Sequence, residues 1–171
     1  MMMGSLGVVA AIIASLMPSL VLAQSVSPSP NATPVVLSSG VAFFENITLT
    51  SPFMPDPAVV HGISGGDVPA EEVAGRPETA TGACIGFIDS EPDHRMTLNT
   101  PFDLLSLRVQ ATDDTTLVVR GPGGVWCNDN YTDWNPGIVG QWLSGTYDIW
   151  IGSLSQGEYY PYVLEFSATA E

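Results

Sequence analysis

The chain has 171 residues and a formal net charge of −14 at neutral pH, with four Arg and no Lys. Such an acidic surface repels phosphate backbones and anionic lipid, which argues against nucleic-acid binding and against peripheral membrane binding. The same acidity is also what keeps an exported protein soluble, so it does not by itself indicate a cationic ligand.

The N-terminus has the pattern of an export signal. Residues 1–23 contain no charged side chain and end on Val-Leu-Ala, which predicts a secretory signal peptide cleaved after Ala23. A retained membrane anchor is the alternative, but Pro18 interrupts the apolar run and the run is short for a spanning helix. We therefore expect a mature chain that is not inserted in a membrane and is secreted, periplasmic or attached to the cell surface.

After the signal, residues 24–41 are rich in Ser, Pro, Thr and Val and predict a flexible leader. The folded domain is expected over residues 42–171. Its first strand should include Phe43, Ile47 and Leu49, which share one parity. Residues 51–82 are rich in Pro and Gly, so we expect a long loop there, with a helical turn at residues 70–73.

The remaining sequence predicts short strands separated by turns rich in Gly, Pro and Asp. The expected strands cover residues 84–88, 94–98, 104–111, 115–120, 125–127, 146–151 and 159–166. The residues expected on their inward faces are His94, Met96 and Leu98, then Leu105, Leu107, Val109 and Ala111, and finally Tyr160, Tyr162, Leu164 and Phe166. Pro161 should lie at an edge or a bulge, because proline cannot donate to a strand ladder. Strands of this spacing without amphipathic helices indicate an all-β fold, a single antiparallel, jelly-roll-like β-sandwich domain.

Cys84 and Cys127 are the only two cysteines. An even pair in an exported chain is most simply a disulfide. A catalytic thiol or half of a zinc site are the alternatives, although the pair lacks a C-x-x-C spacing and the chain has only two His.

One stretch carries a family resemblance. Residues 113–130 read D-D-T-T-L-V-V-R-G-P-G-G-V-W-C-N-D-N, and a G-T-Y-D-I-W-I-G-S strand follows at residues 145–153. This order of an Asp, a Leu-x-Val strand, a Gly-Pro-x-Gly turn, an Asp-rich loop and a Gly-x-Tyr strand resembles the pre-peptidase C-terminal domain family and its small secreted bacterial relatives. The resemblance covers roughly residues 84–166. It implies a non-catalytic β-sandwich and names no ligand.

Residues 62–66 fit the G-x-S-x-G pattern of a serine hydrolase, with Ser64 as the nucleophile. That motif requires a strand before the serine and a helix after it. The sequence predicts neither, because Pro55, Pro57 and Pro69 surround it. A small serine hydrolase using Ser64 is therefore the least favoured of the hypotheses, and we expect no enzymatic activity.

An oxygen-rich cluster indicates a calcium site. The loop after Cys127 contains Asp129, while Asp113 and Asp114 precede the neighbouring strand of the same hairpin. Calcium takes carboxylate and carbonyl oxygens in irregular geometry. The hairpin register should bring the two acidic groups to one end of the sandwich. The competing interpretation is that Asp and Asn side chains cap turns there.

Aromatic residues could supply a flat surface for a sugar or another polymer. Trp134 lies in a polar loop, and Trp150 has the parity opposite to Tyr147, Ile149 and Ile151. These two tryptophans are the expected exposed binding residues. The sequence thus predicts an exported non-catalytic module with an unknown protein or polymer partner and no certain cofactor. A calcium-dependent binding module is the alternative.

Overall fold

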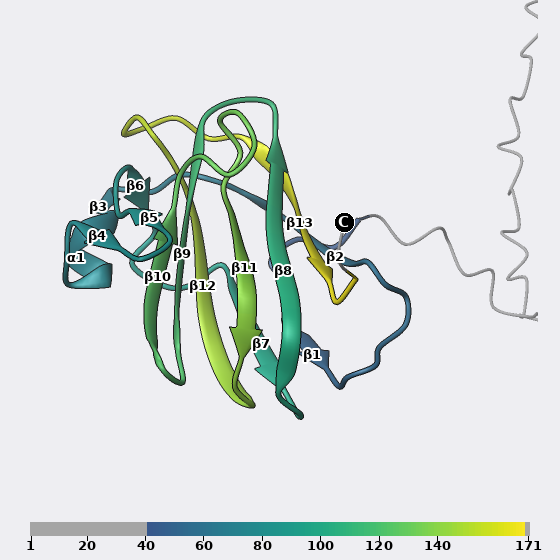
Figure 1. Cartoon of the computed structure of the whole chain (residues 1–171). Coiled ribbons are helices and arrows are strands. Elements are labelled where there is room, and N and C mark those ends of the chain that lie inside the picture. The colour runs from purple at the N-terminus through teal and green to yellow at the C-terminus, as the bar shows by residue number, and fades with distance from the viewer. Residues whose placement is uncertain (1–40, 170–171) are drawn as a thin grey trace, which may run out of the picture. The chain divides into compact units, whose positions relative to one another are not determined.

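The computed structural model in Figure 1 describes residues 41–169. These residues form thirteen strands and one five-residue helix, so the predicted all-β class is confirmed. Two mainly antiparallel sheets pack face to face around a common core. The expected signal peptide lies outside the described residues, as does the expected leader apart from residue 41.

The larger sheet is organised around its long central strand, β12. Its strands in chain order are β1 (Ile47–Leu49), β3 (Val68–Pro69), β6 (Phe87–Ile88), β7 (His94–Leu98), β9 (Thr115–Gly121), β10 (Gly124–Asn128) and β12 (Gly145–Ser153). Strand β12 pairs antiparallel with β9 along one edge and with β7 along the other. Strand β1 then joins β7 in a parallel pair.

The smaller sheet has four strands in the order β11, β8, β13, β2. Their bounds are β2 (Ala58–Ile63), β8 (Phe102–Ala111), β11 (Gly137–Trp142) and β13 (Pro161–Ser167). The short strands β4 (Glu78–Thr79) and β5 (Gly82–Ala83) form a ribbon of their own, and the helix α1 (Ala70–Ala74) lies beside it.

The main core fills the space between the two sheets. Alternate residues of β8 and β13 point into it as predicted, namely Leu105, Leu107, Val109, Tyr162, Leu164 and Phe166. The larger sheet contributes residues of β7, β9 and β12, including the predicted Met96 and Leu98. Burial of these side chains, at about 1.5–3 kcal/mol each, is the main force that holds the sheets together.

A second, smaller core covers the outer face of the larger sheet. Cys84, Cys127, Val118 and Trp150 are buried there against Ala70 of α1. The predicted disulfide between Cys84 and Cys127 is present and crosses this layer. The segment that contains α1, β4 and β5 is therefore fixed covalently to β10.

The first predicted strand begins later than expected. Strand β1 starts at Ile47, while Phe43 and Phe44 are exposed and lie outside any strand. Phe44 has a φ of 59°, a left-handed conformation that interrupts an extended chain. Its backbone N–H donates to the carbonyl of His61 at 2.8 Å, which ties this segment to the edge of β2.

The expected long loop over residues 51–82 is wrong in part, because it contains strand β2 and the short strands β3 and β4. The inward residues of β2 include Ala58 and Val60, which are buried in the main core. The flanking prolines concealed this alternation. Helix α1 starts where the sequence placed a helical turn and ends at Gly75, whose φ of 71° caps it.

Two other expectations also need correction. Of the strand expected over residues 84–88, only Phe87 and Ile88 form a strand, β6, because Gly86 adopts a φ of 87° against the backbone of Ser153. Strand β11 was not predicted. Pro161 does not lie on an edge strand: it is the first residue of β13 and pairs with Ile63, while pairing with β8 starts one residue later.

The disulfide closes a loop with a sequence separation of 43 residues. Replacing both cysteines by serine should lower the free energy of unfolding by about 4 kcal/mol in the chain-entropy model. Denaturant unfolding of the variant and of the oxidised protein measures this difference. Reduction of the natural protein should reproduce the loss, and equal midpoints for oxidised and reduced protein would contradict the structural role of the bridge.

Candidate binding site at the loop end of the sandwich

Three connections meet at one end of the sandwich, and we call them together the loop end. They are the turn 112–114 between β8 and β9, the loop 129–136 between β10 and β11, and the loop 154–160 between β12 and β13. The backbone N–H of Thr115 donates to the carbonyl of Trp134 at 3.4 Å, and that of Leu154 donates to the carbonyl of Asp114 at 3.2 Å. The turn 112–114 therefore joins the two longer loops.

The loop 129–136 is held in place by Asn side chains. Asn135 accepts a hydrogen bond from the backbone N–H of Ala111 at 2.9 Å, which attaches the loop to the end of β8. Asn128 accepts from the N–H of Gly137 at 2.9 Å and donates to the carbonyl of Thr81 at 2.8 Å. Asn and Asp are thus used for turn geometry here, and the residues between them are presented on a fixed backbone.

Exposed apolar side chains lie on the two longer loops. Trp134 is 53% exposed, as its place in a polar loop predicted, and Tyr159 is 55% exposed. Leu154 is also exposed. Large rings exposed on a rigid backbone are typical of surfaces that bind another molecule, because they offer contact area at low entropic cost.

The expected exposure of Trp150 is wrong, since only 2% of this residue is exposed. Its parity was assigned correctly, and its side chain does leave the main core. The outer face that it enters is covered by the second core, with α1 and the disulfide. The guanidinium of Arg120 lies 5.1 Å from the ring centroid and completes the cover. Trp150 therefore cannot act as a surface binding residue in this fold.

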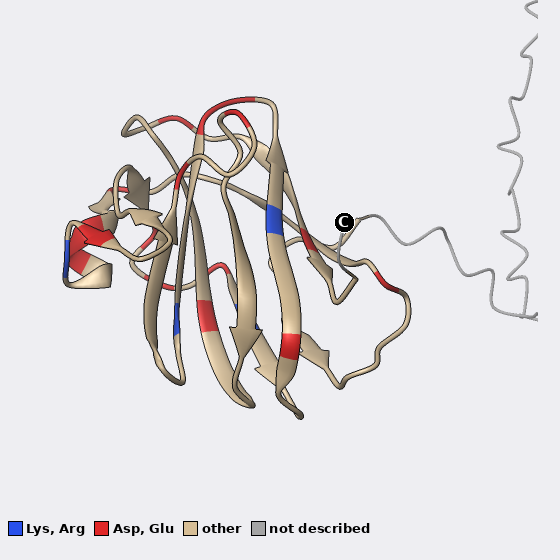
Figure 2. Ribbon diagram, in the orientation of Figure 1, with Lys and Arg blue, Asp and Glu red and all other residues tan. Residues whose placement is uncertain are grey.

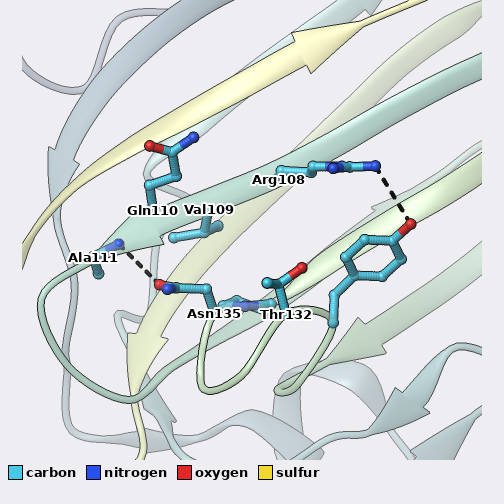
Figure 3. A pocket seen from close by; sticks show the side chains of 8 residues that line it. Arg108, Val109, Gln110, Ala111, Thr132 and Asn135 are labelled. Carbon is cyan, nitrogen blue, oxygen red and sulfur yellow. Dashed lines mark hydrogen bonds between the residues drawn. The ribbon is translucent and has the colours of Figure 1, made fainter. Parts of the chain in front are cut away.

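A pocket of about 420 Å³ lies beside the loop 129–136, where the loop meets the outer face of β8 (Figure 3). The close-up shows Arg108 and Gln110 of β8 and Thr132 of the loop among the residues that line it. The Arg108 guanidinium lies 5.0 Å from the centroid of the Tyr131 ring and donates to its hydroxyl at 3.4 Å. The walls can donate and accept hydrogen bonds, so the pocket suits a small polar group.

No pattern in the sequence indicates this pocket, because its lining residues come from β8 and from the loop 129–136. Arg108 and Gln110 have the parity opposite to the buried Leu107 and Val109, which is a signal that they face outward. That signal says nothing of what lies beside them. Only the pairing of β11 with β8 brings the loop 129–136 over their side chains.

Carboxylates gather at the same end, and Figure 2 shows red segments on all three connections. The β9–β10 pairing has the predicted register, which sets the turn 112–114 near the loop 129–136. Burial raises the pKa of Asp114, and the charges of Asp129 and Asp113 raise it further. A hydrogen bond to Glu158 is the main cause that raises the pKa of Tyr160 to about 12.

The three predicted metal ligands are thus close enough to interact electrostatically. Within residues 41–169, however, no group of three or more His, Cys, Asp and Glu side chains is placed to hold a metal ion. The calcium site stays a prediction. The Asp113 carboxylate accepts a hydrogen bond from the N–H of Asp114 at 2.9 Å, which is the turn-capping role proposed as its alternative.

Ser64 is buried and its hydroxyl connects two chain segments. Its oxygen lies 2.9 Å from the hydroxyl of Ser153 and accepts a hydrogen bond from the N–H of Tyr160 at 3.1 Å. The absence of a strand before Ser64 was a wrong expectation, because β2 ends at Ile63. The hydroxyl nevertheless faces the start of β13 and the end of β12, where it contributes to the packing of the loop 154–160.

The imidazole of His94 is held by hydrogen bonds within the fold. Its Nδ1 lies 2.7 Å from the carbonyl of Glu45, and its Nε2 lies 2.7 Å from the hydroxyl of Tyr162. Burial lowers the pKa of this imidazole. The ring is therefore a structural link between β7, β13 and the segment before β1.

Asp93 is a buried carboxyl group beside that histidine. It accepts a hydrogen bond from the N–H of Ile151 at 2.7 Å. Burial is the largest cause that raises its pKa to about 7, and the nearby charge of Asp89 acts in the same direction. The protonated form is thus favoured by folding.

Comparisons with known proteins leave the family open. No family model matches the chain. An uncharacterized protein of Synechococcus elongatus is 33% identical over 86 residues, a stretch that covers 48% of this chain and 63% of that protein. The crystal structure of PliG from Aeromonas hydrophila, a periplasmic inhibitor of g-type lysozyme, has a TM-score of 0.41 and 17% identity. It covers 72% of this chain and 96% of that one, and a likeness at this level carries no functional conclusion.

The sequence predicts that the mature chain is not inserted in a membrane. Among residues 41–169, no helix has both the length and the apolar character that a membrane span requires.

The buried Asp93 predicts an unusual pH profile. A carboxyl group whose pKa is raised in the folded state contributes stability below its unfolded pKa of 3.8, and this is lost as the pH rises through about 7. The expected slope is about 1.4 kcal/mol per pH unit in that window. The lowered pKa of His94 acts with the opposite sign, since its contribution is present above pH 6.5 and is lost on acidification.

Asp93→Asn should flatten the profile between pH 4 and 7, because the amide oxygen can still accept from Ile151 and has no proton to release. Urea midpoints measured across this range test the expectation. Glu91→Gln removes one charge from the same turn at an exposed position and serves as the control. A profile of Asp93→Asn that parallels the control would show that Asp93 is not the responsible group.

Proposed function

We propose that the chain is an exported, non-catalytic binding module that contacts a protein or polymer partner through its loop end. The observation that carries the proposal is the exposed Trp134 on a loop fixed by Asn135 and by the carbonyl contact to Thr115. A large exposed ring on a fixed loop is difficult to explain by folding alone, since its burial would stabilise the fold more.

Other features support this proposal. The disulfide is typical of proteins in oxidising compartments, which favours the periplasm, the cell surface or the exterior of the cell. The resemblance to pre-peptidase C-terminal domains favours a non-catalytic module. The engagement of both Ser64 and His94 in structural hydrogen bonds agrees with a role other than hydrolysis.

Trp134→Ala should abolish capture of the partner from the exported fraction with only a small change of the melting temperature, because 53% of Trp134 is exposed. Leu143→Ala is the matched control. Leu143 is 59% exposed in the turn between β11 and β12, at the opposite end of the sandwich. Equal capture by both variants would place the binding surface elsewhere.

Ser64→Ala should leave that capture intact. It should cost about 1–2 kcal/mol of stability, because the N–H of Tyr160 loses its hydrogen-bond partner inside the protein. Denaturant unfolding and the capture assay measure the two effects. Labelling of the natural protein by an active-site serine probe, lost in this variant, would instead support the hydrolase.

The alternative function is calcium-dependent binding. The observation that favours it is the mutual repulsion of Asp113, Asp114 and Asp129, which a divalent cation would relieve. In that case millimolar calcium should raise the melting temperature by mass action, and Asp129→Ala should remove the rise. The same melting temperature with calcium and with chelator would leave turn capping as the role of these residues.

A further inference from the structure

We infer that the partner of the loop end is a positively charged protein, which docks with Trp134 and Tyr159 as its central contacts and the surrounding carboxylates as its rim. This inference rests on the proposed function and specifies the partner.

The two aromatic residues lie on loops that the turn 112–114 holds together. Trp134 is fixed through its carbonyl to Thr115, and the loop that carries Tyr159 is fixed through Leu154 to the adjacent Asp114. The Tyr159 ring lies directly over Gly65, at a distance that would not accommodate a Cβ atom. Trp and Tyr are the residues most often found at the energetic centre of protein interfaces. Leu154 adds an exposed apolar side chain to the loop that carries Tyr159.

The rim of this surface is acidic. The five carboxylates at the loop end belong to Asp113, Asp114, Asp129, Asp133 and Glu158. Three of the four arginines contact other groups. Arg95 pairs with Asp148 at 2.9 Å, Arg120 lies over Trp150, and Arg108 lies over Tyr131 beside the pocket. Burial raises the pKa of Asp114, and the charges of Asp129 and Asp113 raise it further; a cationic partner would offset this repulsion between carboxylates.

Charge complementarity selects among the classes of partner. Nucleic acids and anionic polysaccharides would be repelled by these carboxylates. A neutral polysaccharide would contact the rings but gain nothing from the acidic rim. A protein with exposed Lys and Arg side chains satisfies both features, and its association would be accelerated by the opposite charges.

The test measures binding of cytochrome c, a small basic protein, and of its succinylated form, in which the lysines carry negative charge. All measurements contain a chelator, so calcium cannot contribute. At low ionic strength the natural protein should bind cytochrome c and not the succinylated form. The affinity should fall at least tenfold in Trp134→Ala combined with Tyr159→Ala, and also in Asp113→Asn combined with Asp129→Asn.

The matched control for the charge change is Glu71→Gln combined with Glu72→Gln. These residues belong to α1, and the pair removes the same number of charges away from the loop end. The control should change the affinity less than twofold. An equal loss in the control would mean that only the net charge matters, and no binding of cytochrome c would overturn the inference directly.

The outcomes also separate this inference from the proposed function. If Trp134→Ala abolishes capture from the exported fraction while the Asp113 and Asp129 variant has no effect on either assay, the loop end binds a partner that is not cationic. If Trp134→Ala changes neither assay, both the inference and the proposed function fail.

Discussion

The disulfide between Cys84 and Cys127 is the constraint on which the arrangement of this domain depends. The segment between β2 and β7 has few residues that could bury much surface by themselves, because its strands β3 to β6 are two residues long. The bridge fixes this segment over Val118 and Trp150, so the larger sheet is covered on both faces. Thr79 and Thr81 also contribute hydrogen bonds to the backbone of Cys127, which satisfy part of the free edge of β10.

Because the outer face of the larger sheet is covered, a tryptophan on that face is buried, while a tryptophan in a loop at the end of the sandwich stays exposed. Trp150 completes the second core, whereas Trp134 has no layer above it. The backbone of the loop that carries Trp134 is fixed by Asn side chains rather than by strand pairing. The loop therefore keeps a defined position without the alternating sequence of a strand. The loop end is therefore held in place by hydrogen bonds from the side chains of Asn128 and Asn135 to the backbone.

The sequence predicts the parts of the fold in which a regular alternation is long enough to be recognised. The strand at His94 to Leu98, the inward residues Leu105 and Leu107, and the β9–β10 hairpin around its Gly-rich turn are examples. Strand β2 was missed because prolines precede it and small residues weaken its pattern. Trp150 was misplaced because parity gives the face of a strand but not what covers that face.

The distribution of charge gives two roles to the acidic residues. Asp93 is buried beside Ile151, where its proton is retained more strongly than in the unfolded chain, so it acts on the stability of the core. Asp113 and Asp129 remain near solvent, where their charges act on Asp114 and on whatever approaches the loop end. Since the pocket, the exposed rings and these charges occupy the same end, the sequence of the three connections can vary without disturbing the two cores. The exposed residues of the loop end and the residues that hold the fold together are thus separate sets in one small domain.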